Sequence, residues 1–115
     1  MKYVSRKEWG AIPTQKPMRG FRKAPEGIVV HHTTGGASDP AKRVRGHDRY
    51  HVHTRGWTTI AYNWLVSGET GEIFEGRGWH VGGATRGWNS KTVAISYVGS
   101  GDDLTEKGKA AIRTV

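Results

Sequence analysis

Six histidines in a chain of 115 residues supply a high density of side chains that can bind transition metals. A catalytic zinc site uses three protein ligands, drawn from imidazoles, carboxylates and thiolates, and leaves a fourth position for water. The chain has no cysteine, which excludes thiolate ligands, disulfides and cysteine nucleophiles together. The placement of the histidines therefore decides whether metal chemistry is possible.

His31 and His32 end a run of mostly β-branched residues, Gly27 to His32, that predicts a buried strand. Consecutive residues of a strand point to opposite faces of the sheet, so only one of the two imidazoles can face a given site. The other is expected to pack or to hydrogen-bond. For either histidine taken alone, the sequence supports such a structural role at least as well as it supports metal binding.

His47 and His51 are four residues apart in a predicted helix that begins at Ser38-Asp39-Pro40 and runs to about His51. The spacing places both imidazoles on one face, as in His-Glu-x-x-His zinc enzymes, but the glutamate of that motif is missing. A partly buried helix face with hydrogen-bonded imidazoles is the favoured interpretation. His53 follows the helix and is expected to be exposed.

Tyr62 falls within a second predicted strand, Thr59 to Val66. On its own, this position predicts core packing. A phenol is nevertheless a proton donor at neutral pH, and beside a metal it can donate a hydrogen bond to a developing oxyanion. Both interpretations stay open for the residue taken alone.

The elements that must position these side chains include two further strands, at residues 72–75 and 91–98, and a last helix at 106–115, capped by Thr105. The turn Ser67 to Gly71 joins two strands into a hairpin. Residues 1–26 and 76–89 are predicted to be irregular. Strands alternating with helices predict an α/β fold, and the length fits one domain. Because the last helix has no glycine cap and no exit loop, the chain is expected to stop inside that domain.

The composition is that of an ordinary globular protein with a strongly basic balance. Hydrophobic residues make up 35%, and the formal net charge is +8 with a pI of about 10.1. Such a surface attracts polyanions: nucleic acid, anionic lipid and the anionic polymers of bacterial cell walls are all eligible. The alternative, that the positive charge serves only to keep the protein soluble, is equally well supported. No segment is apolar enough to span a bilayer.

Five short motifs follow one another along nearly the whole chain. They are Ser5 to Ala11 (Ser-Arg-Lys-Glu-Trp-Gly-Ala), Val29 to Thr34 (Val-Val-His-His-Thr-Thr), the stretch from Tyr50 to Asn63, Glu75 to Trp79 (Glu-Gly-Arg-Gly-Trp), and Gly87 to Ile95. Each is weak alone. In this order and at these spacings they resemble the type 2 N-acetylmuramoyl-L-alanine amidase and peptidoglycan-recognition protein family, which includes bacteriophage endolysins.

The resemblance implies a central mixed β-sheet flanked by helices, and zinc-dependent hydrolysis of the amide between N-acetylmuramic acid and L-alanine in peptidoglycan. His31 would be a Zn²⁺ ligand and Tyr62 the catalytic tyrosine near the metal. Four residues would lie along or near the groove for the glycan-peptide stem: Trp57, Trp79, Arg86 and Asn89. The family takes its other ligands from a segment after the last helix. Residues 1–115 are therefore expected to be a C-terminally incomplete catalytic domain.

Three alternatives stay open. Some members of the family bind wall fragments without cutting them, and the short ligand set favours this for the chain as given. A nucleic-acid-binding domain fits the charge and the tryptophans, but no recognised nucleic-acid fold signature is visible. In the third, His47, His51, His53 or a second chain completes the zinc site around His31.

The expected partner is bacterial peptidoglycan, with no nucleic acid and no membrane insertion, and the chain is expected to be a monomer. The N-terminus has no apolar segment typical of a secretory signal. For a member of the family that the chain resembles, this N-terminus, the small size and the basic charge suit a phage lytic enzyme, so the resemblance implies one. Such an enzyme is made in the cytoplasm of the infected host and acts on the cell wall.

Overall fold

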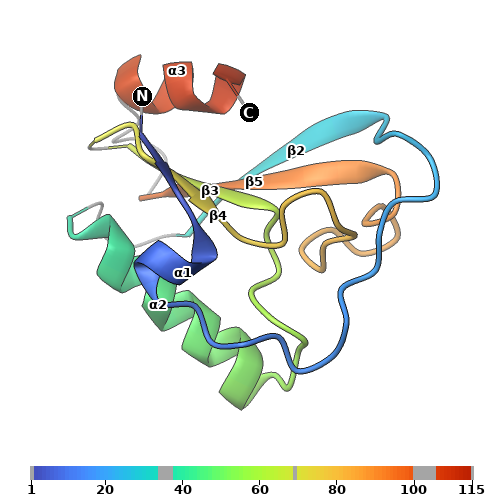
Figure 1. The fold of residues 1–115 in the computed structure, drawn as a ribbon. Helices are drawn as coiled ribbons and strands as arrows, with labels where there is room; N and C mark the ends of the chain where they lie inside the picture. Colours follow the sequence, from blue (N-terminus) through green and yellow to red (C-terminus); the bar gives the residue numbers. More distant parts are fainter. Residues whose placement is uncertain (1, 34–37, 69, 100–105, 115) are drawn as a thin grey trace.

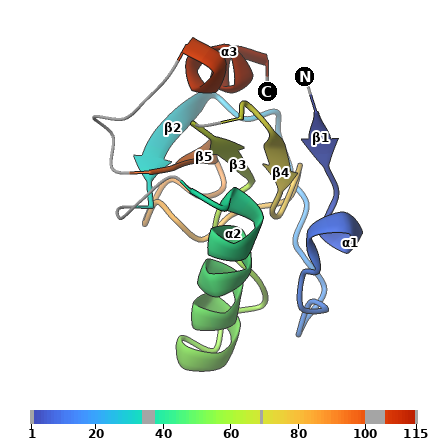
Figure 2. The same cartoon turned by 90° about the vertical axis from the view of Figure 1, so that its left-hand side faces the viewer.

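The computed structural model describes residues 2–33, 38–68, 70–99 and 106–114. Five strands form one sheet in the order β1-β4-β3-β5-β2. Two helices cover it, α2 on one face and α3 on the other (Figure 1, Figure 2). The elements in chain order are β1 (Tyr3–Val4), α1 (Arg6–Trp9), β2 (Gly27–His32), α2 (Pro40–Arg49), the π-helical turn η1 (Tyr50–Thr54), β3 (Trp64–Ser67), β4 (Ile73–Glu75), β5 (Thr92–Val98) and α3 (Glu106–Thr114).

The sheet is mixed, which confirms the predicted fold class. β5 pairs in parallel with both β2 and β3, β3 and β4 form the predicted antiparallel hairpin, and β1 joins β4 in parallel. β5 therefore separates β2 from β3. No helix among the described residues is long and apolar enough to cross a bilayer.

Each face of the sheet has its own apolar core. On the α2 side, Val44 packs with residues such as Leu65, Phe74 and Trp9. On the α3 side, Ala111 packs with residues that include Ile95. Successive residues of β5 alternate between these cores, so the strand is buried along its length, as expected for a strand with neighbours on both edges and helices on both faces.

The predicted strand Thr59 to Val66 is wrong in its first half, since β3 begins only at Trp64. Side chains form hydrogen bonds with backbone groups that would otherwise pair with a neighbouring strand. Arg77 Nε donates to the carbonyl of Ile60 at 2.9 Å, and the Ala61 amide donates to His51 Nδ1 at 3.1 Å. The chain before β3 is thus an irregular, bent segment held by hydrogen bonds with side chains of other elements.

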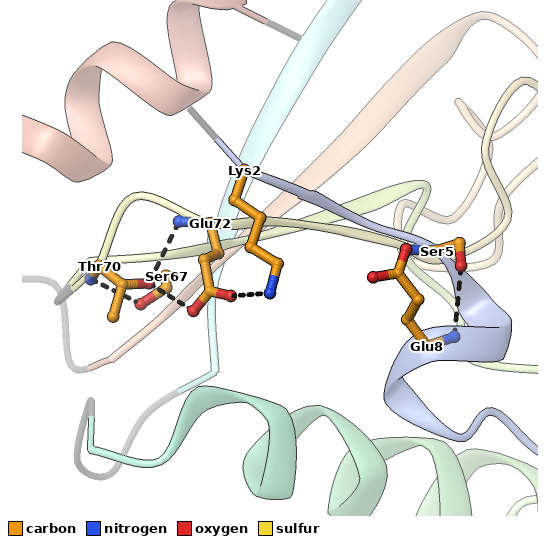
Figure 3. Close-up of polar contacts among 6 residues, drawn as sticks. All are labelled: Lys2, Ser5, Glu8, Ser67, Thr70 and Glu72. Atoms are coloured by element: carbon orange, nitrogen blue, oxygen red, sulfur yellow. Dashed lines mark hydrogen bonds and ion pairs between the residues drawn. The ribbon is translucent and has the colours of Figure 1, made fainter.

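The N-terminal segment is more ordered than predicted. β1 and the short helix α1 lie within residues 1–26, and Ser5 caps α1 (Figure 3). Ser5 Oγ accepts the Glu8 amide while Glu8 Oε1 accepts the Ser5 amide, each at 3.2 Å. This Ser-x-x-Glu capping box is a sequence signal for a helix start. An ion pair at 4.0 Å between Lys2 and Glu72 links this end to the β3–β4 hairpin (Figure 3).

The helix α2 begins where predicted but is not capped as predicted. Asp39 precedes it in the left-handed conformation, with φ 51°, and its side chain makes no capping hydrogen bond. Pro40 opens the helix as expected. The helical path continues beyond the predicted end at His51, through η1 to Thr54. The predicted cap Thr105 and the last residue, Val115, lie outside the described residues.

Candidate functional site

Three aromatic side chains meet on the α2 face of the sheet. The Tyr62 ring lies between His31 and His51, with ring centroids 5.7 Å and 5.8 Å away. His31 comes from the carboxyl end of β2, His51 from η1, and Tyr62 from the segment before β3. His31 and Tyr62 do not lie on neighbouring strands, because β5 separates β2 from β3 and Tyr62 precedes β3. The two side chains are close nonetheless.

His31 is the member of the His31-His32 pair that faces this site. It is half-buried, whereas His32 is exposed, in agreement with the alternation of a strand. His31 Nε2 lies 3.1 Å from the Thr85 hydroxyl oxygen. Burial, together with the nearby His32, lowers the pKa of His31, so its imidazole is neutral at neutral pH. A neutral imidazole is the form that binds zinc.

His51 has a different role from His31. Its Nδ1 accepts the Ala61 amide at 3.1 Å, so the neutral ring carries its proton on Nε2. Burial is the main cause that lowers the pKa of His51 to about 4, with smaller contributions from His47, Arg77 and Arg55. His51 is therefore a neutral hydrogen-bond donor beside Tyr62. This agrees with the interpretation of His47 and His51 as a helix face of hydrogen-bonded imidazoles.

An open cleft of about 890 Å³ runs along α2 to Tyr62. Its lining carries more positive than negative groups. The lining residues are Ser38, Asp39, Lys42, Arg43, Gly46, His47, Arg49, Tyr50, His51 and Tyr62. Three full positive charges face one carboxylate, which suits a polar ligand with free carboxylates.

Trp57 lies beside this cluster. Its ring centroid is 4.7 Å from that of His51, and the Arg55 guanidinium lies 5.0 Å from the Trp57 ring centroid. A smaller hollow of about 340 Å³ opens at Trp57, between Gly56 and Gly83. This hollow shares no lining residue with the cleft along α2.

Asn89 and Arg86 belong to the loop that meets His31. Asn89 Oδ1 accepts the Thr85 amide at 2.8 Å, and the Thr85 hydroxyl in turn contacts His31. Asn89 therefore influences the surroundings of His31 indirectly, by holding the conformation of the loop that carries Thr85. Arg86 is the exposed neighbour of Thr85.

Trp79 is not brought together with Tyr62. Its ring meets Trp64 edge-on at 5.9 Å, and Trp64 belongs to the core on the α3 side. Trp79 is 60% exposed and lines a separate hollow with Ile28 and Val93. The structure places it across the sheet from the His31–Tyr62 cluster.

Three polar residues that hold the site were not predicted as such. Arg6 donates from its guanidinium to the carbonyls of Gly76 and Ile12, and Arg77 donates to those of Ile60 and Val81. Asn63 is fully buried and fixes the loop after β4. All three lie in the motifs quoted above, but a motif does not state whether a residue binds ligand or backbone.

The described residues do not complete a metal site. Among residues 2–33, 38–68, 70–99 and 106–114, no three histidine, aspartate or glutamate side chains converge. His51 uses Nδ1 as an acceptor and carries a proton on Nε2, so it is not a ligand in this state.

Residues 21–115 match the family model described as N-acetylmuramoyl-L-alanine amidase, Amidase_2. The chain belongs to this family. Peptidoglycan recognition protein 1 of Bos indicus is 39% identical over 103 residues, which cover 84% of this chain and 53% of that protein. Peptidoglycan-recognition protein SC2 of Drosophila simulans is 36% identical over 104 residues, with 84% and 54% covered. The chain thus spans about half the length of these relatives.

Solved structures of peptidoglycan recognition proteins superimpose closely on this chain. The complex of the PGRP-LCa and PGRP-LCx ectodomains with tracheal cytotoxin gives a TM-score of 0.91 at 29% identity, over 99% of this chain and 72% of that one. Bumblebee PGRP-SA gives 0.89 at 27% identity, over 98% and 71%. PGRP-LE, solved with the same cytotoxin, a monomeric diaminopimelic acid-type peptidoglycan, gives 0.88 at 28% identity, over 97% and 69%.

The buried His51 predicts a loss of stability in mild acid. Its pKa in the folded state, about 4, lies below the ordinary value of 6.5, so the unfolded chain binds more protons between these two pH values. Stability from this group is complete above about pH 6.5 and falls as the pH drops towards 4, by roughly 2–3 kcal/mol. His31 and His47, whose pKa values are also lowered, act in the same direction.

Urea unfolding of the wild type and His51→Gln at several pH values measures this effect. The decline in stability between pH 7 and 4.5 should be smaller in His51→Gln than in the wild type. His53→Gln is the matched control, because His53 is exposed and lies two residues away. Equal declines in all three proteins would refute the assignment to His51.

Proposed function

We propose that this chain binds the peptide stem of peptidoglycan in the cleft beside α2 and acts at the amide between N-acetylmuramic acid and L-alanine. The observation that carries the proposal is the contact of His31 and Tyr62, 5.7 Å apart, at the end of a basic cleft. Membership of the amidase family supports it. The tracheal cytotoxin complexes of similar proteins support the choice of ligand.

The cleft suits the chemistry of a peptide stem. Lys42, Arg43 and Arg49 offer charged donors to its carboxylates, and charge-assisted hydrogen bonds are about twice as strong as neutral ones. His51, neutral and protonated on Nε2, offers one further donor to a backbone carbonyl. Trp57 supplies an aromatic surface beside it. Together these groups orient the stem with its first amide towards Tyr62.

Tyr62 would stabilise the transition state. Its hydroxyl would donate a hydrogen bond to the oxyanion that develops as the amide carbonyl becomes tetrahedral. A zinc ion, when bound, would supply Lewis-acid polarisation of the same carbonyl. His31 would be one ligand of that ion, held in orientation by its contact with Thr85. The described residues contribute this one ligand and not a full set.

The test uses sacculi incubated with zinc and purified protein, and counts newly released alanine amino termini. Tyr62→Phe removes only the hydroxyl, so hydrolysis should fall by about 10²–10³-fold, while binding of sacculi stays within about threefold of the wild type. Tyr3→Phe is the control for loss of a phenol, because Tyr3 is exposed on β1. Undiminished hydrolysis by Tyr62→Phe would refute the role of the phenol.

A second candidate is a binding module that does not cut. The single ligand among the described residues favours it, and the similar proteins are named for recognition. This function predicts that wild-type protein binds sacculi equally with and without a chelator. It also predicts that no alanine amino termini are released at any zinc concentration.

A further inference from the structure

A second basic hollow lies at the opposite end of β2 from His31. It has a volume of about 540 Å³, and its lining includes Arg19, Arg22, Lys23 and Lys91. Two loops form it, the loop that follows α1 and the loop that precedes β5. These loops lie beside one another where β2 and β5 begin (Figure 1). Because His31 is near the carboxyl end of β2, this hollow is separate from the cleft at Tyr62.

The positive charges of this hollow are not neutralised within the described part of the chain. All four basic side chains are exposed, and none forms an ion pair with a described carboxylate. Glu26 is the one acidic residue in the lining. The surface therefore carries an excess of three positive charges at neutral pH.

Backbone hydrogen bonds hold the two loops in place. The Val81 amide donates to the Arg19 carbonyl and the Glu26 amide to the Lys91 carbonyl, both at 2.6 Å. A β-bridge between Gly20 and His80 adds a third tie. Since the loop backbones are fixed relative to one another, the basic residues are held around one hollow before any ligand arrives. Such preorganisation lowers the entropic cost of binding.

We infer that this hollow binds the phosphodiester backbone of an anionic wall polymer of the poly(glycerol phosphate) type, an inference that rests on the proposed function of the cleft. A guanidinium group can form two parallel hydrogen bonds to one phosphate, a bidentate pair, and a lysine ammonium adds a positive point charge. Two arginines and two lysines around one hollow match a ligand with repeated phosphates. Peptidoglycan itself carries carboxylates and amides, which the cleft at Tyr62 accommodates.

The aromatic side chains near the hollow favour a polymer without bases. Single-stranded nucleic acid is bound largely by stacking on exposed aromatic rings. Trp88 is exposed nearby, but the Lys91 ammonium lies 5.2 Å from its ring centroid and competes for that face. Phe21, in the same loop as Arg22, packs into the core on the α3 side. The hollow thus offers charge without a stacking platform.

The test measures binding of purified poly(glycerol phosphate) by the double variant Arg22→Glu/Lys23→Glu. Its control is Lys7→Glu/Lys107→Glu, which changes the net charge equally at exposed positions outside the hollow. The first double should weaken binding by about tenfold or more, and the control by less than about threefold. Equal weakening in both would mean that only overall charge acts, and would overturn the inference.

Two further measurements separate the alternatives. Sacculi stripped of the polymer should bind the wild type and both doubles alike, and loss of that binding in the wild type would count against the proposed function of the cleft instead. A single-stranded oligonucleotide that binds more tightly than poly(glycerol phosphate), with the same dependence on Arg22 and Lys23, would overturn the assignment of the polymer.

Discussion

Replacing Asn63 with leucine is expected to lower the free energy of unfolding by about 3–5 kcal/mol. Asn63 is fully buried, and its side chain makes three hydrogen bonds to backbone. Nδ2 donates to the carbonyls of Gly78 at 2.8 Å and His80 at 2.6 Å, and Oδ1 accepts the Ala94 amide at 2.8 Å. Leucine has a similar size but no polar atoms, so it leaves these backbone groups buried without partners.

Asn89→Leu provides the comparison for this effect, measured by urea unfolding of all three proteins. Asn89 is only partly buried, and its side chain contributes a single described bond, to the Thr85 amide. The same chemical change there should cost about 1 kcal/mol. If Asn63→Leu proved no more costly than Asn89→Leu, the role of Asn63 as the link between the loop after β4 and β5 would be wrong.

Replacing Gly76 with alanine is expected to destabilise the protein by about 3 kcal/mol or more and to abolish ligand binding at Tyr62. A Cβ atom at Gly76 would lie 2.1 Å from the Tyr62 carbonyl oxygen and 3.2 Å from that of Asn63. Both contacts are with backbone, so no side-chain rotation relieves them. The segment that carries Tyr62 must move, and the Tyr62 ring moves with it.

Gly27→Ala is the matched control, because nothing lies within 4 Å of the position that its Cβ would take. Gly27 begins β2, where alanine is at least as compatible with a strand as glycine. Thermal unfolding should therefore separate the two variants clearly. A melting temperature for Gly76→Ala equal to that of Gly27→Ala would contradict the close approach of the loop to Tyr62.

Local sequence patterns predicted those elements in which the conformational preference of the residues matches the conformation that they adopt in the fold. The β-branched run of β2, the hairpin of β3 and β4, the buried run of β5 and the proline start of α2 were all visible in the sequence. The α/β class follows from them. The Ser5-x-x-Glu8 capping box also carried a usable signal, and the three prolines of residues 1–26 obscured it.

The site was less predictable, because its geometry depends on long-range contacts. Tyr62 lies in an irregular segment outside any strand, since Arg77 and His51 form hydrogen bonds with the neighbouring backbone. That arrangement joins residues from η1, the segment before β3 and the loop after β4. Periodicity and residue spacing report only local structure, so they could not predict it. Trp79 shows the converse: a motif placed it near the groove, whereas its contact with Trp64 puts it on the other face of the sheet.

The central claim, that a peptide stem binds at the His31–Tyr62 cluster, is tested most directly by nuclear magnetic resonance of the five tryptophan indoles. A soluble N-acetylmuramyl peptide should shift the indole N–H signal of Trp57, which lies 4.7 Å from His51. The signal of Trp79, whose ring packs against Trp64 on the other face of the sheet, should stay unchanged. A shift confined to Trp79, or no shift at saturating peptide, would contradict the claim.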